Sequence, residues 1–189
     1  MAQKEKEMKY SELNLGQVEA IVNKLGGMNG VQRFLRGELT VSARSASLIP
    51  INRSAPFNSE KFIGKGWTIK EEDTCSLALN ELDLTKVSLE TMLRPDELSV
   101  KGEERLRRLK ESNFIRLDAK IFQTLWENKA AIPESWKERV VFFDGTILRS
   151  LRGDRCILSL YWHNGKWYWV CYQLNGDFSF VGPSAVLTS

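Results

Sequence analysis

The sequence is poor in the residues that build metal and disulfide sites. Its 189 residues include one histidine and three cysteines, and the cysteines are odd in number and far apart along the chain. A structural zinc site needs paired cysteines or histidines at short spacings, so we expect no bound metal and no other cofactor. Free thiols are typical of a reducing compartment, so we also expect no disulfide bond and a cytoplasmic protein.

Long hydrophobic runs and a large excess of one charge are missing too. No stretch approaches the ~18 apolar residues that span a bilayer, and charged side chains fill the first ten residues where a signal peptide would need an apolar run. We therefore expect neither a signal peptide nor a membrane partner. The 27 basic residues exceed the 24 acidic ones by three, which is too little to make nucleic acid the obvious partner.

The chain does have the ordinary composition of a folded domain, with 42% apolar and 27% charged residues. Residues 1–41 predict a helical hairpin. Asn14 can cap a helix whose apolar residues follow at helical spacing, Gly26 and Gly27 end that helix, and a shorter helix follows. Residues 42–60 are rich in serine and proline and show no period, so we interpret them as a connector.

Residues 61–189 predict an α+β domain. Its middle part mixes strands and helices, with strands expected at residues 67–69, 76–79 and 87–93 and helices over residues 102–111 and after a cap at Asp118. The helix at 102–111 places glutamates four residues before arginines, which is the favourable ion-pair spacing of an exposed helix. We therefore expect a self-paired surface rather than a phosphate grip from its basic residues, Arg105, Arg107, Arg108 and Lys110.

The last part of the chain, residues 139–189, has the pattern of an antiparallel β-meander. Asn-Gly pairs at residues 164–165 and 175–176 each favour a type I′ turn, because both turn positions need positive φ. Their flanks are β-branched and aromatic, and we expect four strands between Val140 and Val181. The predicted fold class is therefore α+β, with an N-terminal helical hairpin, a mixed middle and a C-terminal β-meander.

A turn at residues 164–165 also sorts the hairpin side chains onto two faces, since they alternate with period two. One face carries leucine, cysteine and tryptophan and is the stronger candidate for core. The other carries Tyr161, Tyr168 and Tyr172, whose rings supply stiff contact area with a polar tip. We predict this second face as the candidate binding face. The alternative is that upstream helices cover it.

Much of the chain resembles a group of uncharacterised bacterial proteins. The N-terminal part of the resemblance lies at residues 16–20 (Gly-Gln-Val-Glu-Ala), 25–27 (Leu-Gly-Gly) and 33–39 (Arg-Phe-Leu-Arg-Gly-Glu-Leu). The rest lies at residues 132–137, 143–146 and 160–162. The resemblance implies a bacterial cytoplasmic origin and carries no particular activity.

One segment has the pattern of an enzyme motif. Residues 140–148 resemble the first motif of haloacid-dehalogenase-type phosphatases, a buried strand that ends in Asp-x-Asp-Gly-Thr. The first Asp of that motif is the nucleophile, but Phe142 occupies its position here. Too few residues follow for the parallel sheet of that fold. We therefore interpret Asp144 and Gly145 as part of a strand and turn and assign no catalytic residue.

The leading prediction is a non-catalytic cytoplasmic binding module whose partner is another protein. The alternative is a nucleic-acid-binding protein that presents Gln32, Arg33 and Arg36 from the helical hairpin to a groove. The near balance of charge predicts that such binding is weak and sensitive to salt. An enzyme comes third, because His163 has no obvious nucleophile partner in the sequence.

Overall fold

The structure is a computed structural model that describes residues 14–39 and 47–188. The chain divides into two compact units, residues 1–43 and 44–189. The smaller unit holds two helices, α1 (Leu15–Lys24) and α2 (Gly27–Leu35).

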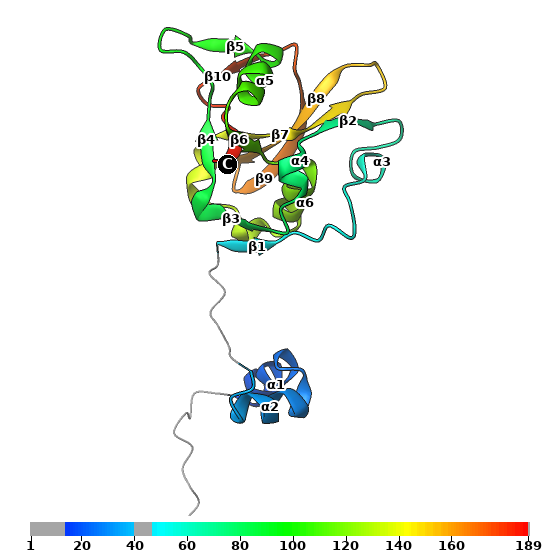
Figure 1. Ribbon diagram of the computed structural model, residues 1–189, viewed down its shortest axis with the longest axis vertical. Coiled ribbons are helices and arrows are strands. Elements are labelled where there is room, and N and C mark those ends of the chain that lie inside the picture. Colours follow the sequence, from blue (N-terminus) through cyan, green and yellow to red (C-terminus); the bar gives the residue numbers. More distant parts are fainter. Residues whose placement is uncertain (1–13, 40–46, 189) are drawn as a thin grey trace, which may run out of the picture. The chain divides into compact units, whose positions relative to one another are not determined.

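The larger unit combines a twisted sheet with short helices, so the α+β fold class is confirmed (Figure 1). Its described strands are β1 (Leu48–Pro50), β2 (Thr68–Glu72), β3 (Glu81–Asp83), β4 (Ser88–Glu90), β5 (Ser99–Lys101), β6 (Phe114–Arg116), β7 (Val140–Arg149), β8 (Arg155–His163), β9 (Lys166–Gln173), β10 (Asp177–Ser179) and β11 (Ser184–Thr188). Its described helices are α3 (Ser59–Phe62), α4 (Thr74–Leu77), α5 (Gly102–Glu111) and α6 (Ala119–Glu127), with 3-10 turns η1 (Leu84–Lys86), η2 (Lys129–Ala131) and η3 (Glu134–Glu138).

The helical pair forms where the sequence predicts it. Asn14 and Gln17 make a capping box, in which each side chain accepts the backbone N–H of the other residue, at 2.9 and 3.0 Å. Gly26 and Gly27 then reverse the chain at positive φ, which glycine adopts without steric cost. None of the apolar side chains of α1 or α2 is buried; only Gly30 is.

Strand β7 is the centre of the main sheet, whose strand order is β4-β11-β7-β8-β9, with β2 and β6 pairing beside it. The antiparallel meander is confirmed for β7, β8 and β9. The prediction of a fourth meander strand was wrong, because β10 pairs with β5 and β11 pairs in parallel with β7. Neither Asn175 nor Gly176 has positive φ, and Gly176 accepts a hydrogen bond from Gly102 instead.

Two other expectations were wrong for local reasons. Residues 76–79 are not a strand, because the Asp73 carboxylate accepts the N–H groups of Cys75 and Ser76 and starts the helix α4. The segment 42–60 was expected to lack regular structure, yet its residues 48–50 form β1 and pair with β3.

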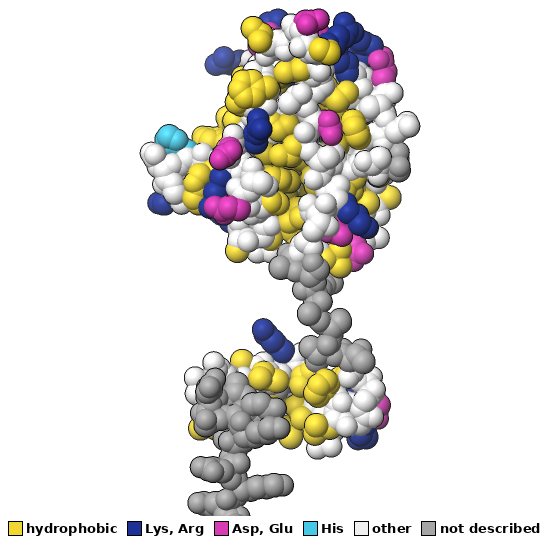
Figure 2. Space-filling model, turned by 90° about the vertical axis from the view of Figure 1, so that its left-hand side faces the viewer, with side chains coloured by type: hydrophobic (Ala, Val, Ile, Leu, Met, Phe, Trp, Pro, Cys, Tyr) yellow, Lys and Arg dark blue, Asp and Glu magenta, His cyan; other side chains and the backbone are white. Residues whose placement is uncertain are grey.

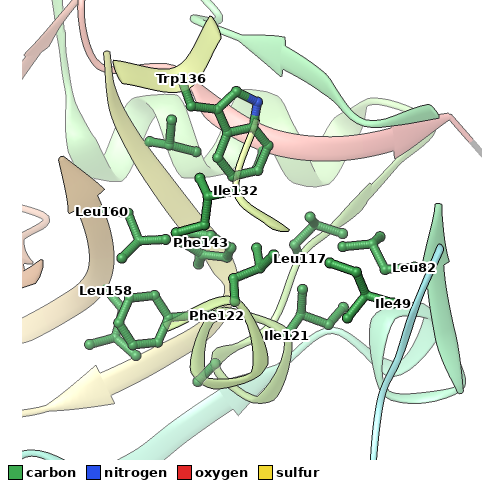
Figure 3. Close-up of a cluster of buried hydrophobic side chains, with 14 of the residues drawn as sticks. Ile49, Leu82, Leu117, Ile121, Phe122, Ile132, Trp136, Phe143, Leu158 and Leu160 are labelled. Carbon is green, nitrogen blue, oxygen red and sulfur yellow. The ribbon is translucent and has the colours of Figure 1, made fainter. Parts of the chain in front are cut away.

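The main hydrophobic core lies between the meander and helix α6. Phe122 and Leu125 of α6 are fully buried, and Phe122 meets Phe143 of β7 edge to face with ring centroids 5.3 Å apart. Figure 3 shows Phe122 and Phe143 converging with Trp136, Ile132 and the leucines of β8. The predicted cap of α6 is confirmed, since Asp118 accepts two N–H groups of its first turn.

A second, smaller core lies on the other face of the sheet, under α5, β5 and β10. At its centre Arg105 is fully buried, so the expectation that the basic residues of α5 are all surface was wrong for this one. Its Nη2 donates to Asp144 of β7 at 2.8 Å and also to Ser184 of β11. Its guanidinium lies 4.8 and 4.4 Å from the ring centroids of Phe142 and Phe178.

The charge pattern of α5 predicted an exposed Arg105, whereas the helix packs this side chain into the smaller core. The expected pair of Glu104 with Arg108 forms, although the Arg108 side chain is only 12% exposed. The expected pair of Glu103 with Arg107 does not: Arg107 pairs with Glu104, and Glu103 pairs with Arg155. Burial lowers the pKa of the Arg105 guanidinium, while the carboxylate of Asp144 opposes that shift. The pair joins α5, β7 and β11, so it fixes the smaller core to the sheet.

We predict that Asp144→Asn destabilises the larger unit by about 3–5 kcal/mol, because it leaves the buried charge of Arg105 without its counter-ion. Replacing both partners, Arg105→Met with Asp144→Leu, should cost much less. Urea titrations give the free energy of unfolding of each variant, with Asp177→Asn in the exposed Lys101–Asp177 pair as the control. An Asp144→Asn protein as stable as the control would contradict this role.

Candidate functional site

The candidate site is built on the hairpin of β8 and β9. Its turn residues Asn164 and Gly165 have φ of 46° and 77°, as a type I′ turn requires. The register follows the prediction, with His163 opposite Lys166 and Tyr161 opposite Tyr168. The predicted division of the side chains into two faces is therefore confirmed.

The face that carries the tryptophans packs on the main core. Leu160 is fully buried, and Trp167 is nearly so. Trp169 is half-buried, with its ring centroid 5.1 Å from that of Phe62 and 6.3 Å from that of Phe122. Most of this face is therefore part of the core, and Trp169 lies at its edge, where it is only half-buried.

The opposite face is partly open. Tyr168, Val170 and Tyr172 of β9 are each about 40% exposed, at 40, 41 and 38%. Tyr161 of β8 is half-buried and stacks on Tyr168, with ring centroids 5.7 Å apart and planes 21° from parallel. We call these four side chains, Tyr161, Tyr168, Val170 and Tyr172, the tyrosine face.

The base of the tyrosine face is rigid. Tyr172 meets Phe142 and Phe178 of the second core, with centroids 5.4 and 5.0 Å away. The face is thus the uncovered continuation of a core that α5, β5 and β10 close at its other end. Figure 1 shows those three elements together at one end of the larger unit.

Further apolar side chains adjoin the tyrosine face. Val140 of β7 lies opposite Tyr161, and its N–H donates to the carbonyl of Val181 at 2.8 Å. Val181 is 40% exposed and its neighbour Phe180 63%. Figure 2 shows hydrophobic side chains gathered over the middle of one face of the larger unit.

The remaining candidate residues from the sequence are Gln32, Arg33 and Arg36 of the helical pair and His163 of the hairpin. Arg33 and Arg36 of the helical pair lie 3.5 and 2.7 Å from the same carboxylate, that of Glu38. Gln32 and His163 are exposed. His163 lies at the tip of the hairpin, with its ring centroid 6.4 Å from that of Tyr168.

The phosphatase-like segment has a structural role, but the turn expected at Asp144 and Gly145 is absent, because β7 continues through both residues. Asp144 is held by Arg105, as described above, and the N–H of Gly145 donates to the carbonyl of Leu117 at 2.9 Å. A Cβ at Gly145 would lie 2.1 Å from the carbonyl oxygen of Arg116. Only glycine allows this close approach of β7 to the end of β6.

Two concave surfaces were not predicted from the sequence. One has a volume of about 490 Å³ and runs beside β9, where residues distant in sequence, Trp67 and Leu151, approach Trp169 and Cys171. The other has a volume of about 460 Å³ and is lined by lysines around Trp162. Nothing in the local sequence indicates either, because each is formed by segments that only the tertiary fold brings together.

Two cysteines line the first of these grooves, Cys156 and Cys171. Burial raises the pKa of the Cys156 thiol to about 11 and that of Cys171 to about 12. Both are therefore uncharged thiols at neutral pH and behave as apolar lining. All three cysteines are free, and Cys75 is exposed.

The described residues contain no group of three or more histidine, cysteine or acidic side chains arranged to hold a metal ion. In the same part of the chain, no helix has both the length and the apolar character needed to cross a bilayer.

The sequence matches no protein-family model, and no significant match was found among curated proteins or solved structures. The resemblance to bacterial proteins therefore stays a prediction.

We predict that Trp169→Ala costs about 3–5 kcal/mol of stability, as truncation of a large core aromatic does. Tyr168→Ser should cost much less, because its ring is only partly packed. Denaturant titrations of the two variants measure both values. Equal losses would mean that both faces of the hairpin are covered, and the tyrosine face would then be no binding surface.

The thiols give a pH-dependent prediction. At pH 8 only about one part in ten thousand of Cys171 is thiolate, the form that alkylating agents attack. Iodoacetamide should therefore modify the exposed Cys75 first, and the rate at Cys171 should rise about tenfold for each further pH unit. Mass spectrometry follows the three sites, with urea-unfolded protein as the control. Equal rates at Cys75 and Cys171 in the folded protein at pH 8 would contradict the burial of Cys171.

Proposed function

We propose that the protein is a non-catalytic binding module and that the tyrosine face takes up another protein. The observation that carries this proposal is the partial exposure of Tyr168, Val170 and Tyr172 on a rigid base, next to Phe180 and Val181. Tyrosine is favoured at interfaces because its ring gives a large contact area at a small cost in side-chain entropy.

The stiffness of the face supports the same proposal. The stacking of Tyr161 on Tyr168 and the contacts of Tyr172 with two core phenylalanines hold three rings in place before any partner arrives. A preorganised surface loses little side-chain freedom on binding, so more of the contact energy appears as affinity.

Nucleic-acid binding by the helical pair finds less support. Glu38 lies against both Arg33 and Arg36, so these two guanidinium groups bring a reduced net charge to any phosphate.

The three free thiols and the resemblance to bacterial proteins support a bacterial cytoplasmic setting, which is part of the same proposal.

Site-specific photo-crosslinking tests the proposed function. With p-benzoylphenylalanine in place of Tyr168, cells that produce the chain naturally should yield a discrete protein adduct. The same group in place of Leu77 of helix α4, which is 38% exposed and lies outside the tyrosine face, should yield none. Adding Tyr161→Ser should weaken the adduct at position 168 by about tenfold or more, because aromatic anchors concentrate interface energy.

An adduct of equal strength at positions 168 and 77 would mean that the tyrosine face has no special affinity. So would an adduct at position 168 that Tyr161→Ser leaves unchanged. Circular dichroism of each variant checks that the hairpin is still folded.

A further inference from the structure

Strand β9 has a free edge. Among the described residues it pairs with β8 alone and is the last strand of the sheet. Leu174 donates its N–H to the carbonyl of Arg155 at 2.9 Å, and hydrogen-bonded pairs alternate along an antiparallel ladder. Tyr168 and Val170 therefore bond to β8, whereas the backbone groups of Trp169 and Cys171 point away from it.

This edge lacks the features that usually protect an edge strand from pairing. Natural edges carry prolines, charges or bulges. Residues 167–173 of β9 have no proline and no charged side chain, and the register with β8 shows no bulge. The backbone groups of Trp169 and Cys171 are therefore a ready template for another strand.

The groove of about 490 Å³ runs along this free edge. We call it the edge groove and define it by Trp67, Leu151, Arg152, Trp169 and Cys171. Its walls are mainly aromatic and aliphatic, and the thiols in it are uncharged. Side chains that point to one side of an added strand would enter this groove, and those that point to the other side would extend the tyrosine face.

The edge groove also contains one cationic side chain without an ion pair. Arg152 makes no ion pair with any residue in the described part of the chain. The nearby carboxylate of Asp154 accepts instead from Ser150 and from Gln173, at 3.1 and 3.2 Å. A ligand that carries a carboxylate beside apolar side chains is complementary to this combination.

We propose that a partner protein binds as an added β-strand, with an extended segment pairing along β9, alternate apolar side chains in the edge groove and a carboxylate at Arg152. This inference rests on the proposed function and specifies how the partner binds. A segment of about seven residues, roughly 24 Å long, matches residues 167–173.

A single extended segment fits this edge better than a second copy of the chain. Trp67 and Leu151 rise beside β9 and form the walls of the groove. A second copy that paired its own β9 here would bring its own Trp67 and Leu151 to the same junction. A segment without flanking walls meets no such obstacle.

Selection from a random heptapeptide library displayed on phage, against the full-length chain, tests the proposal. Enriched peptides should alternate apolar residues and carry an acidic group. Amide hydrogen exchange, read by NMR, then gives a control within the same strand. In the free protein Trp169 and Cys171 should exchange at least about tenfold faster than Tyr168 and Val170, and bound peptide should remove that difference.

N-methylated versions of the best peptide separate backbone pairing from side-chain contact. Methylation of the alternate amides that face β9 should weaken binding by at least about tenfold, because each lost donor removes one hydrogen bond. Methylation of the other set should change it little. Arg152→Gln should weaken binding by about two- to fivefold, as loss of an exposed ion pair does, while the matched variant Arg149→Gln, outside the groove, should not.

Several outcomes would overturn strand addition. These are no enriched peptide, enriched peptides that leave the exchange of Trp169 and Cys171 unchanged, equal effects of the two methylated versions, or a dimer of the chain that protects these amides without peptide. If the adduct at position 168 still forms in any of these cases, the tyrosine face remains a binding surface and only this mode of binding fails. If that adduct is absent as well, both proposals fail.

Discussion

The candidate site depends on the two positive φ angles at Asn164 and Gly165. They set a two-residue turn, and the turn sets the register of β8 against β9. That register places Trp169 against the core and exposes Tyr168. It also determines which β9 amides face the free edge. Because both faces carry aromatic side chains, the burial of apolar residues would favour this register only weakly over the one shifted by one residue. The turn supplies the specificity that the hydrophobic pattern lacks.

A second constraint comes from Arg105 and Asp144. A fully buried ion pair contributes little net stability compared with apolar residues of the same size, but it cannot be broken cheaply. Here it joins the helix α5 to the central strand β7 and to Ser184 of β11. It also places Phe142 and Phe178, which together support the ring of Tyr172. The charge pair at the centre of the smaller core therefore supports the tyrosine face through these two phenylalanines.

The parts of the fold that local chemistry decides could be predicted from the sequence. The caps at Asn14 and Asp118 and the turn at residues 164–165 each bring their own hydrogen bonds or φ values. The parts that tertiary contacts decide could not. Residues 175–176 carry the same Asn-Gly pair, yet β10 pairs with β5, a strand nearly eighty residues earlier in the chain. Arg105 differs from Arg107 and Arg108 in having no glutamate four residues before it and a leucine, Leu109, four residues after it, but only tertiary packing shows its buried partner, Asp144.

The uncharged edge of β9 has a consequence for solubility. Every copy of the protein carries the same unguarded strand. Although Trp67 and Leu151 make pairing of two copies less favourable than addition of a single segment, self-association would still compete by mass action with the partner binding that we propose. A bound partner would withdraw the edge from that competition, and the protein would tolerate a higher concentration with its partner than without it. Synthesis of the two proteins in matched amounts would then keep the chain soluble, in the way that a chaperone keeps an exposed strand from its own copies.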